Sequence, residues 1–394
     1  MKTARASDPV MPVLPPGLWR VMLGTTFVVL SFSLLNPVLA VRLQTGGASA
    51  TAIGLFATLP FLSVAALVPL VPRLFARIGV GQAYRLGLLL ELIACLGYLL
   101  TDDYVAWCAL GLMAGLGAAA AWNATEALIA HNTPASHRGR LTGLYQALLG
   151  GAMALGPFLP SLLGLDPTQA NLVAAGGLAV GLGLTLAPVV TSLKAMHDDH
   201  VPMGLMAAWR FRPALAWAAV VGGVFEVGLG SITTAHGSGI GLDLAMATSI
   251  AGAMGMGSFV LQYPLGWLAD HLPARRLFAI GAAALVLSAV AFVQSTHQPS
   301  LLWVCAALWG GIGGALYTLS MIRVAHDFAD SSALAGTSAM IAGYTAGGAL
   351  GPVISGWAFD HHGVFGQGLW LGVLALSLLL MQARREPPAP GATD

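Results

Sequence analysis

Long apolar runs, separated by short polar or turn-rich breaks, recur along the whole 394-residue chain. A membrane-spanning helix needs about 20 mostly apolar residues, and most of these runs approach or exceed that length. A β-barrel would show short alternating segments instead, so continuous runs favour helices. The pattern predicts an all-α polytopic membrane protein with twelve transmembrane helices, over residues 18–41, 51–71, 84–100, 105–129, 141–163, 169–190, 214–234, 243–266, 276–295, 301–322, 334–355 and 367–383.

Composition supports the same class. Only 8% of residues are charged and 57% are hydrophobic, whereas a typical soluble domain is roughly 25% charged. These values argue against a soluble enzyme and a disordered chain, and the net charge of +1 gives no basis for binding nucleic acid. The three cysteines are scattered through apolar runs and form no CxxC, so we interpret them as packing residues.

The basic residues predict the orientation. Twelve spans place both termini on one side of the membrane. With the termini in the cytoplasm, all of the 17 Lys and Arg residues except Arg42 fall in cytoplasmic segments. Because cytoplasmic loops carry an excess of basic residues, we expect a multi-pass protein of the bacterial inner membrane with both termini cytoplasmic.

The chain divides near its midpoint. A polar stretch at 191–213 separates spans 6 and 7, and the Gly-Pro pair of span 5 recurs in span 11. The number of residues that separates the two Gly-Pro pairs also separates Gly115 from Gly310. Such repeats are typical of transporters built from two similar halves. We predict a cytoplasmic tail (1–17), a six-helix half (18–190), a central cytoplasmic loop (191–213), a second six-helix half (214–383) and a cytoplasmic tail (384–394).

Two loops resemble the signature of the major facilitator superfamily, which usually reads Gly-xxx-Asp-Arg-x-Gly-Arg between spans 2 and 3. In PRLFARIGVGQAYR, Arg77 and Gly79 fit this pattern, while Pro72 and Ala76 replace its Gly and Asp. The corresponding loop of the second half, GWLADHLPARR, keeps the Gly and the Asp. The resemblance covers nearly the whole chain and implies the fold of that superfamily.

Three further segments resemble the YcaD-type branch of the superfamily. They read AGLGAAAAWNATEALIA, RGRLTGLYQALLGG and LQYPLGWLADHL. The resemblance implies a secondary transporter working by alternating access, and it leaves the substrate open.

Two glutamates within spans are candidates for proton coupling or substrate binding. Glu226 lies near the middle of span 7 among small residues, and Glu91 lies midway along span 3. Intramembrane ionisable groups are costly and are functional by default. The alternatives are a protonated carboxyl bonded to a backbone carbonyl for Glu226, and an interhelical hydrogen bond for Glu91.

A cytoplasmic charge network is the predicted inner gate. Glu126 lies near the cytoplasmic end of span 4, and basic residues follow it in the next loop. An ordinary interfacial acid is the alternative for Glu126. The predicted network consists of Glu126, Arg77, Arg138, Arg140, Asp270 and Arg275. On the other side, Arg42 either binds an anionic substrate or Glu91, or extends to the membrane interface.

In the superfamily, spans 1, 4, 5, 7, 8, 10 and 11 line the central cavity. A few polar groups in a mostly apolar cleft suit a small-molecule site, and the same aromatic residues also suit ordinary packing. The cavity-lining candidates are Asn36, Trp122, Asn123, Tyr145, Gln146, Gln262, Tyr263, Tyr317 and Tyr344.

The Gly-Pro pairs, Gly156-Pro157 and Gly351-Pro352, predict close helix approach and a bend. The first resembles the antiporter signature of the superfamily, which favours export, although a copy in span 11 is equally consistent with a packing role. MHDDH at 196–200 is interpreted as a solvated loop, with no metal site.

No nucleotide-binding motif or intramembrane nucleophile is found, so we expect no cofactor and no enzyme activity. We expect a monomer that moves a small organic solute, coupled to protons. The alternatives are a uniporter or importer of an amphipathic nutrient, or a non-transporting membrane sensor.

Overall fold

The computed structural model describes residues 16–67, 70–133, 135–186, 205–328 and 333–383. Every regular element within these ranges is a helix, and the described part of each predicted span is mostly helical. The prediction of an all-α membrane protein is therefore confirmed.

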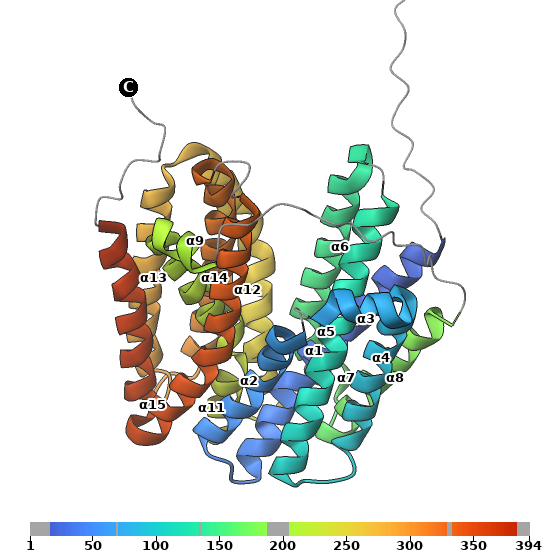
Figure 1. Cartoon of the computed structure of the whole chain (residues 1–394). Helices are drawn as coiled ribbons and strands as arrows, with labels where there is room; N and C mark the ends of the chain where they lie inside the picture. Colours follow the sequence, from blue (N-terminus) through green and yellow to red (C-terminus); the bar gives the residue numbers. More distant parts are fainter. Residues whose placement is uncertain (1–15, 68–69, 134, 187–204, 329–332, 384–394) are drawn as a thin grey trace, which may run out of the picture.

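The first half of the chain lies on the right in Figure 1, with its own core of buried side chains. Several spans are interrupted or accompanied by short helices. The elements are α1 (Pro16–Thr45), α2 (Ala50–Leu67), α3 (Val71–Ile78), α4 (Val80–Gly97), α5 (Tyr104–Asn132), α6 (Ala135–Leu155), a 3₁₀ turn (Gly156–Phe158), α7 (Leu159–Leu163) and α8 (Pro167–Leu184).

The second half lies on the left and has a separate core. Its first helix, α9 (Leu205–Phe211), falls inside the predicted central loop, whose MHDDH segment is outside the described residues. The other elements are α10 (Pro213–Gly223), a π-helical turn (Val224–Gly228), α11 (Gly230–Gly239), α12 (Leu244–His271), α13 (Ala274–Val293), α14 (Leu301–Asp327) and α15 (Ala333–Ala383).

Breaks explain why the helices do not map one to one onto the predicted spans. Within the described ranges, nine helices are long and apolar enough to cross a membrane, or ten if Pro213–Gly228 and Gly230–Gly239, bent by 41°, form one span. One of the nine, Ala335–Gln382, includes both of the last predicted spans. These meet at Gly363, whose φ of 60° and ψ of −150° interrupt the helical geometry. A side chain at this φ would be strained, so glycine suits the corner.

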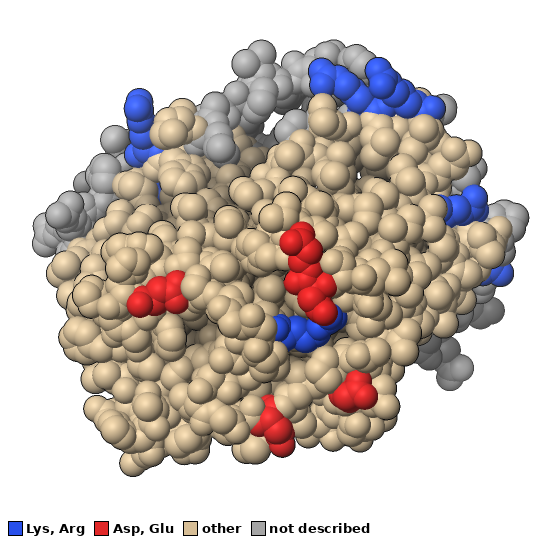
Figure 2. All heavy atoms as spheres, turned by 90° about the horizontal axis from the view of Figure 1, so that it is seen from below, with Lys and Arg blue, Asp and Glu red and all other residues tan. Residues whose placement is uncertain are grey.

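Acidic residues cap three of the helices that start at the lower end of the molecule in Figure 1. The carboxylates of Asp103, Asp166 and Asp243 accept hydrogen bonds from the first turns of α5, α8 and α12. A helix leaves its first N–H groups unpaired, and a carboxylate at the N-cap satisfies one of them. Figure 2 views this lower end and shows several acidic groups with one basic side chain among them.

The two halves meet towards the lower end. Gly54 of α2 lies so close to the Pro352 carbonyl of α15 that an added Cβ would overlap it. Gly356 approaches the Ala50 carbonyl in the same way. The Thr58 hydroxyl also donates to the Ala349 carbonyl. Glycine thus permits helices of opposite halves to pack with their backbones in contact.

Candidate functional site

Glu226 lies within the π-helical turn that joins α10 to α11. A π turn is a local departure from α-helical hydrogen bonding and is frequent at functional sites. The residue is only partly buried, in contrast to Val224 and Phe225 beside it. The turn therefore places one carboxylate where neighbouring helices and solvent both reach it.

Two hydroxyl groups from two different helices donate to this carboxylate. The Ser258 hydroxyl of α12 donates to Glu226 Oε1 at 2.6 Å, and the Tyr344 hydroxyl of α15 donates to Oε2 at 2.8 Å. The Ser258 distance lies in the range of O–H bonds to a charged oxygen, and the Tyr344 distance is typical of O–H···O bonds in general. We refer to Glu226, Ser258 and Tyr344 as the Glu226 cluster.

Glycines and a second tyrosine surround the cluster. A Cβ on Gly314 of α14 would meet Glu226 Oε1 and the Ser258 hydroxyl, so this position has no room for a side chain. The ring of Tyr317 lies 4.6 Å from that of Tyr344, centroid to centroid, with a tilt of 45°. Tyr317 and Tyr344, both predicted to line the cavity, thus lie beside the predicted proton-coupling glutamate.

The arrangement gives the carboxyl group two distinct bonding states. An ionised carboxylate only accepts hydrogen bonds, whereas a protonated one also donates one. Gain of a proton removes the negative charge that strengthens both bonds and adds a donor that needs an acceptor, so it alters the bonding that joins span 7 to spans 8 and 11. This is a direct chemical link between protonation and the packing of three helices.

Asn36 lies at the junction of the two halves. Its Oδ1 accepts a hydrogen bond from the Ser231 hydroxyl of α11. The Ser238 hydroxyl of α11 donates to Gln44 Oε1 at 3.0 Å, about two helical turns further towards the lower end. Spans 1 and 7 are therefore joined by polar contacts, and only the first of these involves a predicted cavity residue.

No hydrogen bond joins the other predicted cavity residues to the cluster within the described part of the chain. Tyr145 is buried, the Asn123 amide donates to the Ala119 carbonyl of its own helix, and Tyr263 is 83% exposed. Gln146 and Gln262 are also exposed, and Trp122 is 39% exposed.

The predicted gate network is not brought together among the described side chains. Glu126 Oε1 accepts from the Trp122 indole at 2.6 Å, Arg77 is exposed on α3, and Arg275 Nε donates to the Gln382 carbonyl at 2.6 Å. The side chains of Arg138, Arg140 and Asp270 are outside the described ones. The gate network stays a prediction.

The predicted structural Gly-Pro pairs occupy different settings. Gly156 and Pro157 begin the 3₁₀ turn after α6, with Gly156 packed against Ser33 and Leu34 of α1. Gly351 and Pro352 remain inside α15, with Gly351 packed against Val224. The first pair interrupts its helix, and both pairs lie at close helix contacts.

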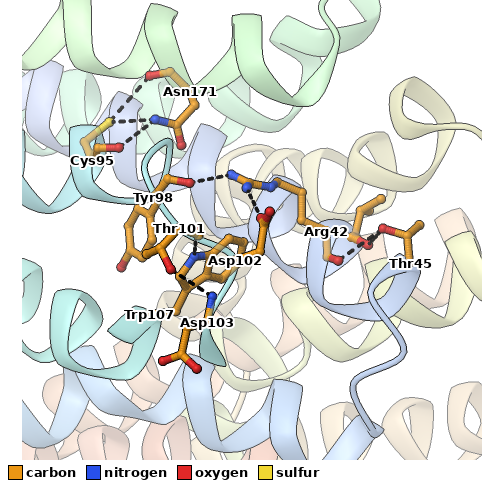
Figure 3. Close-up of polar contacts among 10 residues, drawn as sticks. Arg42, Thr45, Cys95, Tyr98, Thr101, Asp102, Asp103, Trp107 and Asn171 are labelled. Carbon is orange, nitrogen blue, oxygen red and sulfur yellow. Dashed lines mark hydrogen bonds and ion pairs between the residues drawn. The ribbon is translucent and has the colours of Figure 1, made fainter. Parts of the chain in front are cut away.

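Arg42 binds an acidic residue that sequence reasoning did not single out. Figure 3 shows its guanidinium between the Tyr98 carbonyl, at 2.9 Å, and Asp102 Oδ1, at 2.8 Å. The guanidinium carbon also lies 4.5 Å from the centre of the Trp107 ring. These contacts join span 1 to the loop after span 3. Arg42 and its partners are too far apart in the sequence for a local pattern to reveal these contacts.

The fold is that of a multi-pass α-helical membrane protein, and comparison with known proteins assigns its family. The family model described as Major Facilitator Superfamily matches residues 21–331 and 215–394. The chain belongs to this superfamily.

Named relatives are similar but distant. The chain is 25% identical over 298 residues to the uncharacterized MFS-type transporter YcaD of Escherichia fergusonii, covering 73% of this chain and 75% of that one. It is 23% identical over 338 residues to YfkF of Bacillus subtilis, also an uncharacterized MFS-type transporter, covering 83% and 84%.

Two solved structures share the fold. The nucleoside transporter NupG superposes with a TM-score of 0.76 at 12% identity, covering 94% of this chain and 100% of that one. A D-xylose-proton symporter superposes with a TM-score of 0.74 at 15% identity, covering 96% and 100%. At these identities the likeness shows the fold alone.

Proposed function

We propose that this protein is a proton-coupled secondary transporter that moves a small organic solute across the bacterial inner membrane by alternating access, with Glu226 as the proton-carrying group. The observation that carries the proposal is the pair of hydroxyl donors, Ser258 and Tyr344, that reach one carboxylate from two helices. No other intramembrane glutamate of the chain, within the described residues, has hydrogen bonds to two neighbouring helices in this way.

The coupling follows from bond exchange. With Glu226 ionised, its two oxygens accept from spans 8 and 11 together. With Glu226 protonated, the carboxyl group loses its charge and its own hydroxyl needs an acceptor, so both bonds weaken and one of them can reverse. Protonation thus changes how span 7 packs on its neighbours, and a two-state element biased in this way couples a proton to a conformational change.

The direction of transport is export. The Gly156-Pro157 pair of span 5 resembles the antiporter signature of the superfamily, and its close contact with α1 fits a bend that moves with the transport cycle. The distribution of Lys and Arg supports cytoplasmic termini, which makes the lower end of the molecule the outer face. The halves meet towards that end, as expected for a state open to the cytoplasm.

A solute screen followed by a flux assay tests this function. Purified wild-type protein is screened by thermal shift against a panel of organic solutes, and the strongest stabiliser is then followed in proteoliposomes. An exporter in right-side-out vesicles expels the solute faster when the outside is made acidic, because the proton gradient then favours exchange. Flux that ignores the imposed gradient contradicts coupling, and accumulation of the solute inside under the same gradient contradicts export.

A further inference from the structure

A second acidic site lies within the first half, apart from the Glu226 cluster. Glu91 of α4 is only 6% exposed, and its Oε1 has no hydrogen-bond partner among the described residues. The residue lines a cavity of about 70 Å³ between α1, α2, α4, α5 and α8. The interhelical hydrogen bond expected as the alternative role of Glu91 is thus not made by this oxygen.

An unpaired buried carboxyl group is costly. Burial of a polar group without a hydrogen bond costs roughly 1–3 kcal/mol of folding free energy, and burial of an unpaired ionised group costs much more. Buried charges are therefore normally paired. Since the protein supplies no partner for Oε1 within the described part of the chain, the atom is available to a donor that enters the cavity.

The lining of the cavity selects the kind of donor. Aside from Glu91 it is mostly apolar, with the aromatic rings of Phe32, Phe56 and Tyr98 and the small side chain of Ala118. Asn36 also lines it, but its Oδ1 is already bonded to Ser231. A metal cation would need several oxygen ligands, which this lining lacks. An ammonium group suits it, because ammonium donates to carboxylate and is attracted to aromatic faces.

The size of the cavity limits the ligand. One water-sized group needs about 10–15 Å³ by this measure, so 70 Å³ accommodates roughly five. A primary amine with three carbons has four non-hydrogen atoms. The adjacent cation, Arg42, contacts the Tyr98 carbonyl but is paired with Asp102, as Figure 3 shows. The charge of Arg42 is therefore compensated by Asp102, and neither side chain lines the cavity.

We infer that the cavity at Glu91 binds a small primary alkylammonium ion, with Glu91 Oε1 as the acceptor and the aromatic rings around the alkyl chain. The inference rests on the cavity alone and holds whether or not transport is coupled to protons through Glu226. It makes small amines a class of ligand that this protein recognises.

Isothermal titration of the full chain in detergent tests the site, with n-propylammonium chloride as the probe. We expect the wild type to bind it and Glu91→Gln to weaken binding at least tenfold. Asp243→Asn, which removes a carboxylate at an exposed helix cap, should bind as the wild type does. Sodium chloride at equal concentration controls for ionic attraction, and 1-propanol controls for simple filling of the cavity.

Ala118→Leu gives an independent arm, because it fills the cavity and leaves the carboxyl group in place. It should also weaken binding at least tenfold, and thermal unfolding and gel filtration confirm that each variant is folded. The inference is overturned if the wild type does not bind propylammonium, or if both cavity variants bind as the wild type does. Equal binding of sodium or 1-propanol would overturn it as well.

Discussion

Asp360 Oδ2 accepts a hydrogen bond from the backbone amide of Thr51 at 2.8 Å, across the boundary between the two halves. Its Oδ1 accepts from the Ala50 amide at 2.8 Å, and its Oδ2 also accepts from the Thr51 hydroxyl. The carboxylate thus caps the first turn of α2 from the opposite half, beyond the end of predicted span 11. Separation of the halves at the lower end must break these hydrogen bonds.

The Asp360 contact predicts a stability that depends on pH. Desolvation raises the pKa of Asp360, but hydrogen bonds from the Thr51 hydroxyl and from the amides of Thr51 and Ala50 outweigh it, so the pKa lies below its ordinary value. Because the pKa of Asp360 is depressed, its ionised carboxylate stabilises the form in which the two halves meet at the lower end. This stabilisation is fully present above the free carboxyl pKa, about 3.9, and is lost as the pH falls below that value. Asp360→Asn should therefore lower the melting temperature at neutral pH, and the difference from wild type should shrink towards pH ~3. A difference that stays constant over this range would contradict the assignment.

The same substitution should separate the halves at the lower end. Spin labels on Thr101→Cys and His297→Cys, in a background without the native cysteines, report the distance between one loop of each half. Asp360→Asn should shift this distribution to longer distances. Asp243→Asn removes a cap within a single half, so it should leave the distribution unchanged. Equal effects of both variants would show that loss of any cap, and not this contact, is responsible.

Gly54 predicts a steric limit on closure. A Cβ there would overlap the Pro352 carbonyl, and overpacking of a tight contact costs about 1–3 kcal/mol. Gly54→Ala should therefore lower the melting temperature and lengthen the same label distance. Gly176→Ala, at a helical glycine with no neighbour within 4 Å of the added Cβ, should be neutral or stabilise by up to about 1 kcal/mol. If Gly54→Ala behaves like Gly176→Ala, the close backbone contact is wrong.

Tyr344 and Tyr317 provide a matched pair for the Glu226 cluster. Tyr344→Phe removes a hydrogen bond to the carboxylate, and a bond of this type contributes about 1.5–3 kcal/mol. It should lower coupled flux at least about tenfold, since 1.4 kcal/mol corresponds to a factor of ten. Tyr317→Phe keeps the ring that packs against Tyr344 and should change flux less than about threefold. Similar losses in both variants would indicate that ring packing matters and the hydroxyl does not.

A buried ion pair joins the start of span 7 to the end of span 10. Arg212 Nε lies 3.1 Å from Asp327 Oδ2, with both side chains less than a tenth exposed. Removal of Arg212 leaves the buried Asp327 carboxylate with the partly exposed Arg323 as its other cationic partner, and breaking a buried ion pair costs up to about 3–5 kcal/mol. Arg212→Ala should thus destabilise strongly. Arg323 also contacts Asp327, but it is 36% exposed, so Arg323→Ala should cost about 1 kcal/mol or less. Chemical unfolding in detergent compares the two, and the reverse ranking would refute this account of the pair.

The fold was largely predictable because lipid imposes a simple rule on the sequence. Each spanning helix must be apolar along its length, so the runs that predict spans also mark the helices. The breaks inside them were less visible. The π turn at Val224–Gly228 contains no proline, and the corner at Gly363 lies in a chain with 50 glycines.

The site was predictable only in part. Glu226 stands out because an acid in an apolar run is rare, but its donors lie 32 and 118 residues away. Tyr344 was predicted as a cavity residue without its bond to Glu226, and Ser258 was not singled out among the many small residues of span 8. Asp360 was missed because its partners, two backbone amides and the Thr51 hydroxyl, lie 309 and 310 residues away in the sequence.

Proton movement driven by solute tests the central claim most directly. Proteoliposomes loaded with a pH-sensitive dye receive the solute that most stabilises the wild type, and internal pH and solute flux are followed together. We predict that the wild type moves protons with the solute, and that Glu226→Gln loses this proton movement but retains exchange of labelled for unlabelled solute. Equal proton movement in the wild type and in Glu226→Gln would contradict the role of Glu226 as the coupling group.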